Sequence, residues 1–462
     1  MLLHLQPPRR SPLVQDYDKK LFPLRKTTSD PACPAANLPE EVIVIILNFL
    51  IGNHHPLQGN LPCEIRRVLR GCSLISFAWL LAVRHLLFEN FPVPRTMSFF
   101  QRLKRIWSSP NLTIDGNEVK ILDVKGSAPV NWTQGPAWVH PAERERVQNL
   151  ANTLDHFLNW VARNPESGGP TFANLRELRL SEMYFRSSLL FNSGEWVVLT
   201  HRTQYSVAHS FLALKRLDLG RVRFLNESLF TSFLGYFHVT LEELILDRVE
   251  IDTYRDFSEH SEIPSSWLLF GDAPLPRLRE LRVSRTAIHV IPLLIPAPNL
   301  HELFVDMTGA QISKKETLEA LIGLACSSQC LNRVTVQGAS YQAGIDDSFF
   351  SGLLSASPSL SELNFHIQQH VFDTVHSPSI PNLNLVTLRL RSLQTEQTNL
   401  RALDNYLRAS FPQLELLHFE LKVPAGTTED QTLGRLGYMM PWCKERGCLN
   451  PSQRWRSEHG GG

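Results

Sequence analysis

Cysteine and histidine side chains are the first candidates for chemistry in this chain of 462 residues, which contains seven cysteines and 17 histidines. Cys326 and Cys330 could share one face of a helix, and Cys443 and Cys448 lie together in a C-terminal segment. A structural zinc ion needs four ligands, and neither pair has a second pair at the required spacing. We therefore predict reduced thiols of an intracellular protein rather than a metal site or a disulfide framework.

Catalytic motifs are also absent from the sequence. It contains no Gly-rich phosphate-binding loop of either common spacing, no HExxH and no GxSxG. The pair His54-His55 lacks a suitably spaced carboxylate or further histidine, and neighbouring carboxylates such as Glu242-Glu243 are more often solvated than catalytic. We therefore expect a protein that is not an enzyme and that needs no metal ion and no cofactor.

Composition narrows the class of partner. Hydrophobic residues make up 43% of the chain and charged residues 20%, which is ordinary for a globular protein. The net charge of +1 gives no basic excess for nucleic acid. No run of 18 apolar residues predicts a membrane span, and the apolar run at the N-terminus is too short for a signal peptide. We expect a cytoplasmic or nuclear protein that contacts neither nucleic acid nor membrane.

A short apolar pattern recurs along the C-terminal part of the chain: an apolar residue, two residues, an apolar residue, one residue, an apolar residue. Its successive occurrences begin at Leu175, Leu214, Leu241, Leu278, Leu300, Leu331, Leu360, Leu385 and Leu414. The segment Val119–Val124 has the same pattern. The last two apolar residues of each occurrence point to one face of a short strand. One such strand cannot bury its apolar side alone, but parallel neighbours form a continuous core.

This pattern resembles leucine-rich-repeat proteins over residues 175–424. The resemblance implies an α/β solenoid with parallel strands on its concave face and helices and loops outside. The repeats begin 22 to 39 residues apart, whereas the family's repeats have about 20–29 residues. The Asn or Cys that often follows the strand is replaced, in five repeats, by Met183, Val222, Val249, Thr286 and Thr308. We expect an irregular arc, with long loops at 181–211 and 252–276.

The residues beside the buried leucines should face away from the core, on the concave face of the arc. The candidate target-binding residues are Arg179, Asp218, Ile245, Arg282, Phe304, Thr335, Asn364, Arg389 and His418. Charges of both signs alternate along these rows, which does not favour a nucleic-acid groove. For any one position a solvated strand residue is the simpler interpretation. As a surface, a concavity that binds a protein is typical of solenoids.

A separate apolar segment lies near the N-terminus. Asn37 is a candidate N-cap, with Pro39 and Glu40 in the first turn. The following EVIVIILNFL is apolar nearly all round, so a helix here must be buried or meet a partner. Its β-branched residues would also suit a strand, but the cap and the length favour a helix. A second helix pair is predicted for residues 64–91.

These segments resemble the F-box, and are most similar to fungal F-box domain-containing proteins. The family's Leu-Pro-x-Glu opening falls on Leu38, Pro39 and Glu41, and its Cys-Ser-Leu-Val-x-x-x-Trp stretch falls on 72–79. Its Arg-x-x-Leu-Phe ending falls on 84–88. The chain departs from the family in a long loop at about 51–66 and in Phe77 and Ala78, which replace polar or basic residues.

The F-box resemblance implies a partner. Such domains bind a Skp-family adaptor and, through it, a cullin. Carried over by position, the adaptor-binding residues are Leu38, Pro39, Val42, Ile46, Leu50, Leu74, Ile75 and Trp79. The alternative is that these residues pack against the repeats.

The sequence thus predicts a tail (1–36), an F-box-like helical module (37–93), a connector with a short strand and an amphipathic helix at 142–163 (94–174), a leucine-rich-repeat-like array (175–424) and a C-terminal cap and flexible tail (425–462). The predicted function is substrate recognition in an SCF-type ubiquitin ligase, with an unknown target protein bound by the arc. The alternative is a leucine-rich-repeat scaffold or inhibitor unconnected to ubiquitin ligases.

Overall fold

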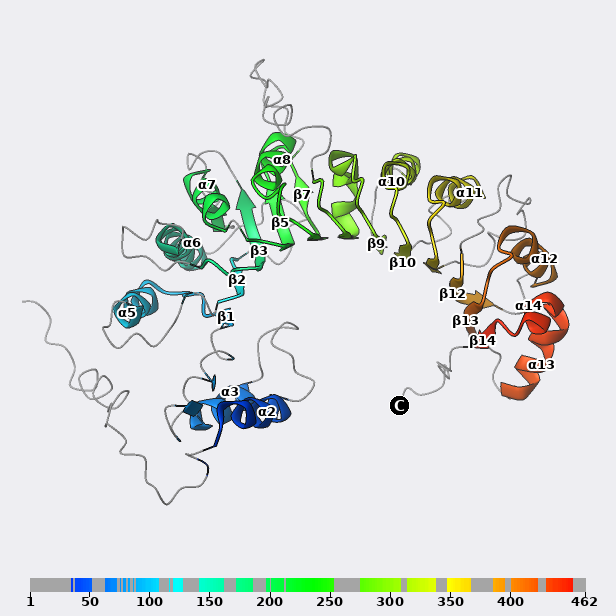
Figure 1. Cartoon of the computed structure of the whole chain (residues 1–462). Coiled ribbons are helices and arrows are strands. Elements are labelled where there is room, and N and C mark those ends of the chain that lie inside the picture. Colours follow the sequence, from blue (N-terminus) through cyan, green and yellow to red (C-terminus); the bar gives the residue numbers. More distant parts are fainter. Residues whose placement is uncertain are drawn as a thin grey trace, which may run out of the picture. The chain divides into compact units, whose positions relative to one another are not determined.

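Short parallel strands and helices alternate along most of the chain in the computed structural model (Figure 1). The chain forms two compact units, residues 1–90 and 91–462, which are described separately. The structure describes residues 35, 38–51, 63–72, 75, 78–79, 82–83, 86, 89–107, 116, 119–127, 141–161, 172–185, 197–199, 201–211, 213–252, 275–308, 314–337, 347–366, 385–394, 400–422 and 429–451. The predicted N-terminal tail apart from Ala35, the F-box-like ending at 84–88 apart from Leu86, and most of the predicted loop 252–276 lie outside the described residues.

The second unit is built on one sheet. Over the described residues it has 14 strands, in the order β1-β2-β3-β5-β6-β8-β9-β10-β11-β12-β13-β14, with β4 beside β3 and β7 beside β5. The strands are β1 (Asn90–Phe91), β2 (Ile121–Lys125), β3 (Glu177–Phe185), β4 (Val197–Leu199), β5 (Arg216–Phe224), β6 (Glu243–Asp247), β7 (Glu250–Ile251), β8 (Glu280–Ser284), β9 (Glu302–Asp306), β10 (Arg333–Gln337), β11 (Glu362–His366), β12 (Thr387–Gln394), β13 (Leu416–Lys422) and β14 (Leu449–Pro451). From β2 to β14 neighbouring strands are parallel.

The repeated leucines set the register of this sheet. Leu178, Leu217, Leu244 and Leu281 are successive Cα partners across β3, β5, β6 and β8. Each is fully buried, so every strand contributes its apolar side to one continuous core. The predicted α/β repeat solenoid with parallel strands is confirmed, and the short strand predicted at 119–124 is β2.

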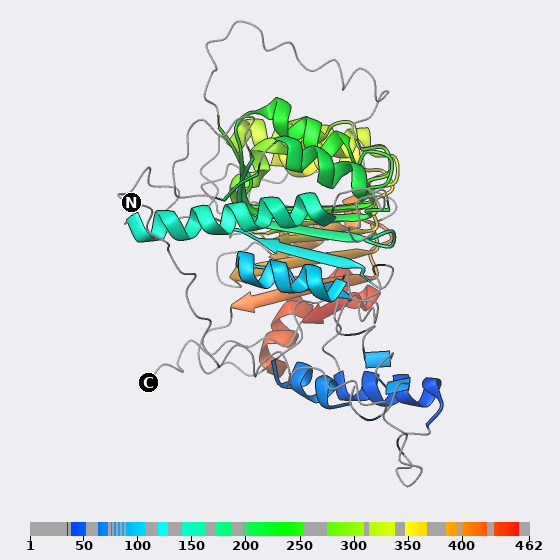
Figure 2. The same ribbon diagram turned by 90° about the vertical axis from the view of Figure 1, so that its left-hand side faces the viewer.

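Helices cover the apolar side of the sheet. They are α5 (Met97–Trp107), α6 (Pro141–Val161), α7 (His201–Ser210), α8 (Glu227–Gly235), the 3-10 helix η6 (Arg285–Leu294), α10 (Lys314–Ser327), α11 (Asp347–Ala356), α12 (Leu400–Ser410), α13 (Glu429–Met439) and α14 (Pro441–Arg446). From α6 to α12 they follow the strands along one side (Figure 1). Figure 2 shows the strands stacked in one direction, with α5 and α6 at the near end. The amphipathic helix predicted for 142–163 is α6.

One prediction about an irregular region is wrong, and one further helix was not predicted. The connector contains α5 in addition to the predicted short strand and amphipathic helix, and α5 buries Phe100 and Leu103. The expected long loop at 181–211 instead contains the end of β3, then β4 and α7. Thr203 and Val207 on α7 are buried, so this helix is part of the core layer. Both helices are short, with 11 and 10 residues, so the apolar period repeats only two or three times in each. α7 also buries the polar residues Thr203 and Gln204 beside Val207, which hides its inner face in the sequence.

Left-handed backbone residues directly precede the positions at which Met183, Val222 and Val249 stand instead of Asn or Cys. Positive φ angles of 57°, 55° and 53° occur at Glu182, Arg221 and Arg248. These residues lie at the same position of three successive repeats, two residues after the last apolar residue of the pattern. A positive φ in a residue other than glycine costs roughly 1 kcal/mol. The turn directs the next residues, Met183, Val222 and Val249, into the core, where each is fully buried and offsets that cost.

Aromatic side chains fill the core behind this turn. The rings of Phe185 and Phe224, from β3 and β5, stack with centroids 4.6 Å apart. Phe233 lies 5.0 Å from Phe185, and Phe230 lies 5.1 Å from Phe224. Both come from α8, which these contacts fix against the sheet.

The first unit is a small helical module. It contains α2 (Glu40–Ile51), α3 (Cys63–Cys72) and further helical residues at 78–79, 82–83 and 86. Its core consists of Ile43, Leu47, Leu69, Trp79 and Val83, together with Ala82. The helix that was predicted instead of a strand for 40–50 is confirmed, and it buries one face against α3 and the segment that follows.

Candidate functional site

One face of α2 is apolar and uncovered by the described residues. Val42, Ile45 and Phe49 are 38%, 67% and 85% exposed. Their spacing of three and four residues places them side by side on the helix. Ile43 and Leu47, on the other side of α2, are fully buried. The helix therefore has an internal apolar face that packs the module and an external one, which we call the outer face of α2.

The predicted adaptor-binding residues divide between these two environments. Leu38, Ile46 and Ile75 pack partly buried against the core of the module. Trp79 is 4% exposed, and its Nε1 donates a 2.7 Å hydrogen bond to the Ala35 carbonyl oxygen. The remaining described members, Pro39, Val42 and Leu50, are exposed, and Leu74 lies outside the described residues. Adaptor contact by these residues stays a prediction, and the burial of Trp79 gives that side chain a structural role.

Ile45 and Phe49 are the two candidates that the sequence analysis left out of its adaptor-binding set. The signal for them was present: they are spaced four residues apart and lie about half a helical turn from Ile43 and Leu47. Which face of a helix that is apolar all round meets the core depends on the second helix. That packing is visible only in the structure.

The polar side of the sheet presents the predicted target-binding residues in one row. Successive Cα partners across the sheet are Arg179, Asp218, Ile245, Arg282, Phe304, Thr335, Asn364, Arg389 and His418. Their leucine neighbours point to the opposite side. The side chains of Arg389 and His418 lie outside the described part of the chain. The structure thus brings these positions together on one face, which we call the polar face, and their contact with a target stays a prediction.

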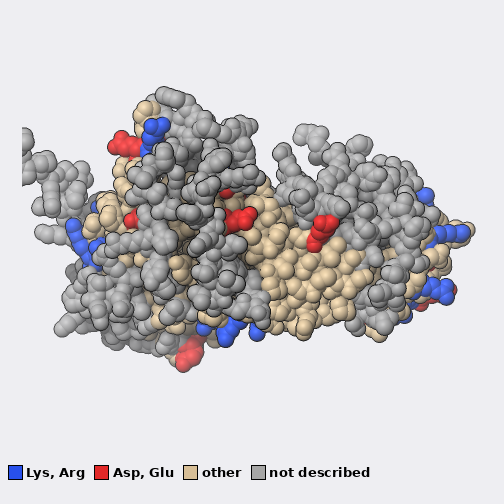
Figure 3. All heavy atoms as spheres, turned by 90° about the horizontal axis from the view of Figure 1, so that it is seen from above, with Lys and Arg blue, Asp and Glu red and all other residues tan. Residues whose placement is uncertain are grey.

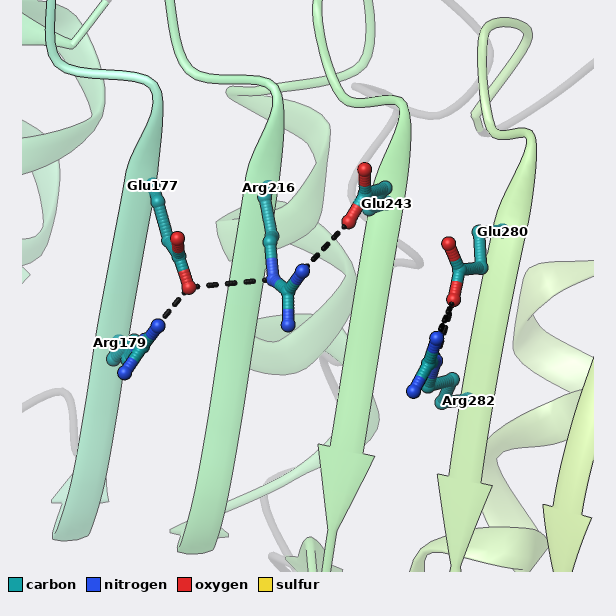
Figure 4. Close-up of polar contacts among 6 residues, drawn as sticks. All are labelled: Glu177, Arg179, Arg216, Glu243, Glu280 and Arg282. Carbon is teal, nitrogen blue, oxygen red and sulfur yellow. Dashed lines mark hydrogen bonds and ion pairs between the residues drawn. The ribbon is translucent and has the colours of Figure 1, made fainter. Parts of the chain in front are cut away.

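Ion pairs link the strands at one end of the polar face (Figure 4). Arg179 donates to Glu177 over 2.6 Å on β3, and Glu177 also contacts Arg216 of β5 at 3.3 Å. Arg216 in turn reaches Glu243 of β6 at 3.0 Å. A short contact joins Arg282 to Glu280 within β8. The face is therefore a lattice of guanidinium and carboxylate groups rather than a set of independent solvated side chains.

A second group of ion pairs links β9, β10 and β11. Arg333 contacts Glu302 at 3.0 Å and Glu362 at 2.9 Å, one on each neighbouring strand. These two carboxylates raise the pKa of the Arg333 guanidinium, Glu362 the more strongly. The pairs are partly exposed, so each contributes little to stability, about 0–1 kcal/mol. Their effect is to hold the side chains of the face in place.

Burial on the polar face shifts the pKa values of its carboxyl groups. Burial raises the pKa of the Asp218 carboxyl, and the nearby guanidinium groups of Arg179 and Arg216 only partly oppose that effect. Burial likewise raises the pKa of Asp123 on β2, opposed by Arg179 and Lys125. These carboxylates lie in a region from which water is partly excluded, where a charged partner would interact strongly.

A cavity of about 820 Å³ lies where the first turn of α5, the first half of α6 and the residues after β2 meet. Its described lining carries the cations Arg95, Lys125 and Arg146 and the acid Glu182, and contains no histidine or cysteine. Lys125 and Arg146 are already paired, with Glu182 and Glu143.

The described residues contain neither a metal-binding cluster nor a membrane-spanning helix. Among the residues that the structure describes, no three His, Cys, Asp or Glu side chains gather as a metal site. Five cysteines are free, at positions 72, 326, 330, 443 and 448. No described helix is both long and apolar enough to cross a membrane. Seen from the helix side, charged side chains are scattered over the described surface (Figure 3).

Comparisons with known proteins assign no family and no function to this chain. No protein-family model matches the chain, and no curated protein matches it in sequence. Among solved structures, it is similar to a chain in the crystal structure of the Rad7 and Elc1 complex in yeast, with 14% identity and a TM-score of 0.31 over 84% of this chain and 91% of that one. It is also similar to a Bacteroides fragilis protein, with 12% identity and a TM-score of 0.30 over 66% and 71% of the two chains. Since both TM-scores are low, we derive a function from the residues of this chain.

Proposed function

We propose that this chain is a non-catalytic substrate-recognition subunit of an SCF-type ubiquitin ligase. In this proposal, the outer face of α2 binds a Skp-family adaptor, which connects to a cullin, and the polar face of the sheet binds a target protein. The chain breaks and forms no bonds itself. It would act by holding a target close to the ligase machinery.

The outer face of α2 is the observation that carries the proposal. Single exposed apolar residues are common on protein surfaces. Here Val42, Ile45 and Phe49 form one continuous stripe, and Phe49 is 85% exposed. Such a stripe is typical of a helix that enters the apolar groove of a partner. Covering a side chain the size of Phe49 is worth about 1.5–3 kcal/mol.

The F-box resemblance identifies the kind of partner. Leu38, Pro39 and Glu41, which open the family's pattern, directly precede and begin this helix. Val42, the next position of the pattern, lies on the outer face. The polar face of the sheet supports the second half of the proposal, because its lattice of charges is held in place and is not covered by helices of its own unit (Figure 1).

Capture of the intact chain by a purified Skp-family adaptor tests the proposal. The variant Ile45→Asp with Phe49→Asp should bind about 100-fold more weakly, because about 3 kcal/mol of apolar burial is lost. Val44→Asp is the control: Val44 is 40% exposed but lies off the stripe, about 140° around the helix axis from Phe49, so its variant should bind normally. Trp79→Ala is unsuitable, since Trp79 is in the core of the module.

Two results would contradict the proposal. One is an intact chain that does not bind the adaptor. The other is a double variant that binds as well as the unchanged chain. Either result would favour the alternative of a repeat scaffold with no link to ubiquitin ligases.

A further inference from the structure

Three neighbouring strands in the middle of the polar face carry a regular array of side chains, which we call the central patch. Strands β6, β8 and β9 are parallel and in register, so their outward positions form three rows. The rows are Glu243, Glu280, Glu302; Ile245, Arg282, Phe304; and Asp247, Ser284, Asp306. The middle row is apolar at both ends, and the rows on either side are acidic.

The charges of the central patch are unbalanced, whereas those of the flanking strands are balanced. The patch has five carboxylates and one guanidinium group. The same three rows hold two carboxylates and two guanidinium groups on β3 and β5, and one of each on β10 and β11. Among these seven strands, the excess of carboxylates therefore lies on the three strands of the central patch taken together.

The neighbouring cations fill this deficit only in part. Glu280 is paired with Arg282 within the patch, and Arg333 contacts Glu302 at 3.0 Å but also Glu362, outside the patch, at 2.9 Å. Arg216 contacts Glu243 at 3.0 Å but also Glu177 at 3.3 Å. Among the contacts drawn in Figure 4, none joins Glu243 to Glu280. Burial raises the pKa of Glu243, and the charge of Glu280 raises it further, against the opposing effect of Arg216. A like-charged pair on adjacent strands is destabilising unless a cation is placed between its members.

The apolar residues of the middle row lie within this acidic frame. Ile245 and Phe304 are only partly buried, on either side of Arg282. Neighbouring strands are about 4.8 Å apart, so the first row spans about 10 Å from Glu243 to Glu302, which is about three residues of an extended chain. A cation near Phe304 would also meet the face of an aromatic ring.

We propose that the central patch binds a short basic segment of a target protein, in which two Lys or Arg residues about three positions apart flank an apolar residue. The cations would fill the charge deficit, and the apolar residue would cover Ile245 or Phe304. This proposal rests on the target-binding half of the proposed function, and it states the chemistry of the target. Complementary charges of this kind set the specificity and the rate of association.

Fluorescence anisotropy with a labelled synthetic peptide tests this proposal on the full chain. The probe is a short peptide with two arginines three positions apart and with leucine and serine between them, and its counterpart has glutamate in place of both arginines. The basic peptide should bind, and the acidic one should not. Glu280→Gln with Glu302→Gln should weaken binding about tenfold, from two partly exposed charge pairs of about 0.7 kcal/mol each.

The control variant removes the same number of charges elsewhere. Glu143→Gln with Glu145→Gln lies in the first turns of α6, and it should leave the peptide affinity unchanged. Thermal unfolding checks that both variants are folded. Independently of any variant, added salt should weaken binding to the unchanged chain, because the contacts are partly exposed ion pairs.

The proposal is overturned if the basic peptide does not bind, if the Glu280 and Glu302 variant binds it as tightly as the unchanged chain, or if the acidic peptide binds equally well. Adaptor capture without peptide binding would remove this proposal alone. Peptide binding without adaptor capture would remove the ubiquitin-ligase assignment and leave the basic-segment site.

Discussion

In the repeat array the recurring leucines of the strands are almost entirely buried, whereas α2 of the helical module leaves Ile45 and Phe49 largely exposed. The difference follows from the number of neighbours. An inner strand of the array has a strand on each side and a helix layer behind it. The module has only α3 and the short segment that follows, and a unit this small buries a lower fraction of its surface.

This contrast indicates that the two units offer partners opposite chemistry. The array completes its own core and presents a polar face of fixed charges. The module completes only one side of α2 and presents an apolar stripe. We expect the apolar surface to form the more durable contact and the charged surface to select among targets. The following predictions, from the largest effect to the smallest, test that contrast.

We expect the largest difference in the free energy of unfolding between substitutions of two phenylalanines, one buried and one exposed. Phe224→Ala should lower the free energy of unfolding of the array by about 3–5 kcal/mol, since a large side chain is removed from a closed aromatic cluster. Phe49→Ala should change it by less than about 0.5 kcal/mol, because Phe49 is on the surface. Denaturant unfolding measures both. Similar losses for the two variants would mean that the outer face of α2 is covered by the chain itself.

A substitution at Gly126, directly after β2, tests how tightly this part of the array is packed. A Cβ at Gly126 would lie 2.3 Å from the Glu182 carbonyl oxygen, so Gly126→Ala should destabilise the array by about 1–3 kcal/mol. The control is Gly434→Ala on α13, where no atom lies within 4 Å of the new methyl group. It should stabilise by about 0.5–1 kcal/mol. Equal effects in thermal unfolding would contradict this packing.

Hydrogen bonds to Asp404 of α12 attach the C-terminal helix α14 to the array. Its buried carboxylate accepts hydrogen bonds from the backbone N–H groups of Trp442 and Cys443, at 3.0 and 3.1 Å, where α14 begins. Asp404→Ala should cost about 1–2 kcal/mol. Hydrogen exchange should then show faster opening of α14 than of the central strands. Unchanged exchange in α14 would show that this contact does not fix the helix.

The smallest effect concerns pH and the polar face. Burial raises the pKa of Asp218 above its unfolded value, so its contribution to stability is present at low pH and is lost as the pH rises through its folded pKa. Asp218→Asn has no carboxyl group at this position, so it lacks this pH-dependent contribution to stability. The variant should therefore gain stability relative to the unchanged chain as the pH rises from acid to neutral. Urea unfolding at several pH values measures the difference, and parallel pH profiles would contradict the assignment.

The strands were predictable because each repeat uses the same spacing, and the strand period of two decides which side chains share a face. Arg179 and Asp218 were therefore placed correctly beside each other. α5 was not predicted, although Phe100 and Leu103 have helical spacing, because a helix of 11 residues repeats the apolar period only two or three times. The roles of Trp79 and Phe49 depend on how the helices of the module pack, and a sequence that is apolar all round a helix does not determine that packing.

The central claim is that the outer face of α2 is a partner-binding surface, and calorimetric titration of the full chain with a purified Skp-family adaptor tests it most directly. We predict one binding site, a negative heat-capacity change from apolar burial, and binding that is about 100-fold weaker in Ile45→Asp with Phe49→Asp but unchanged in Val44→Asp. Equal affinity for all three chains, or no heat of binding for the unchanged chain, would contradict the account.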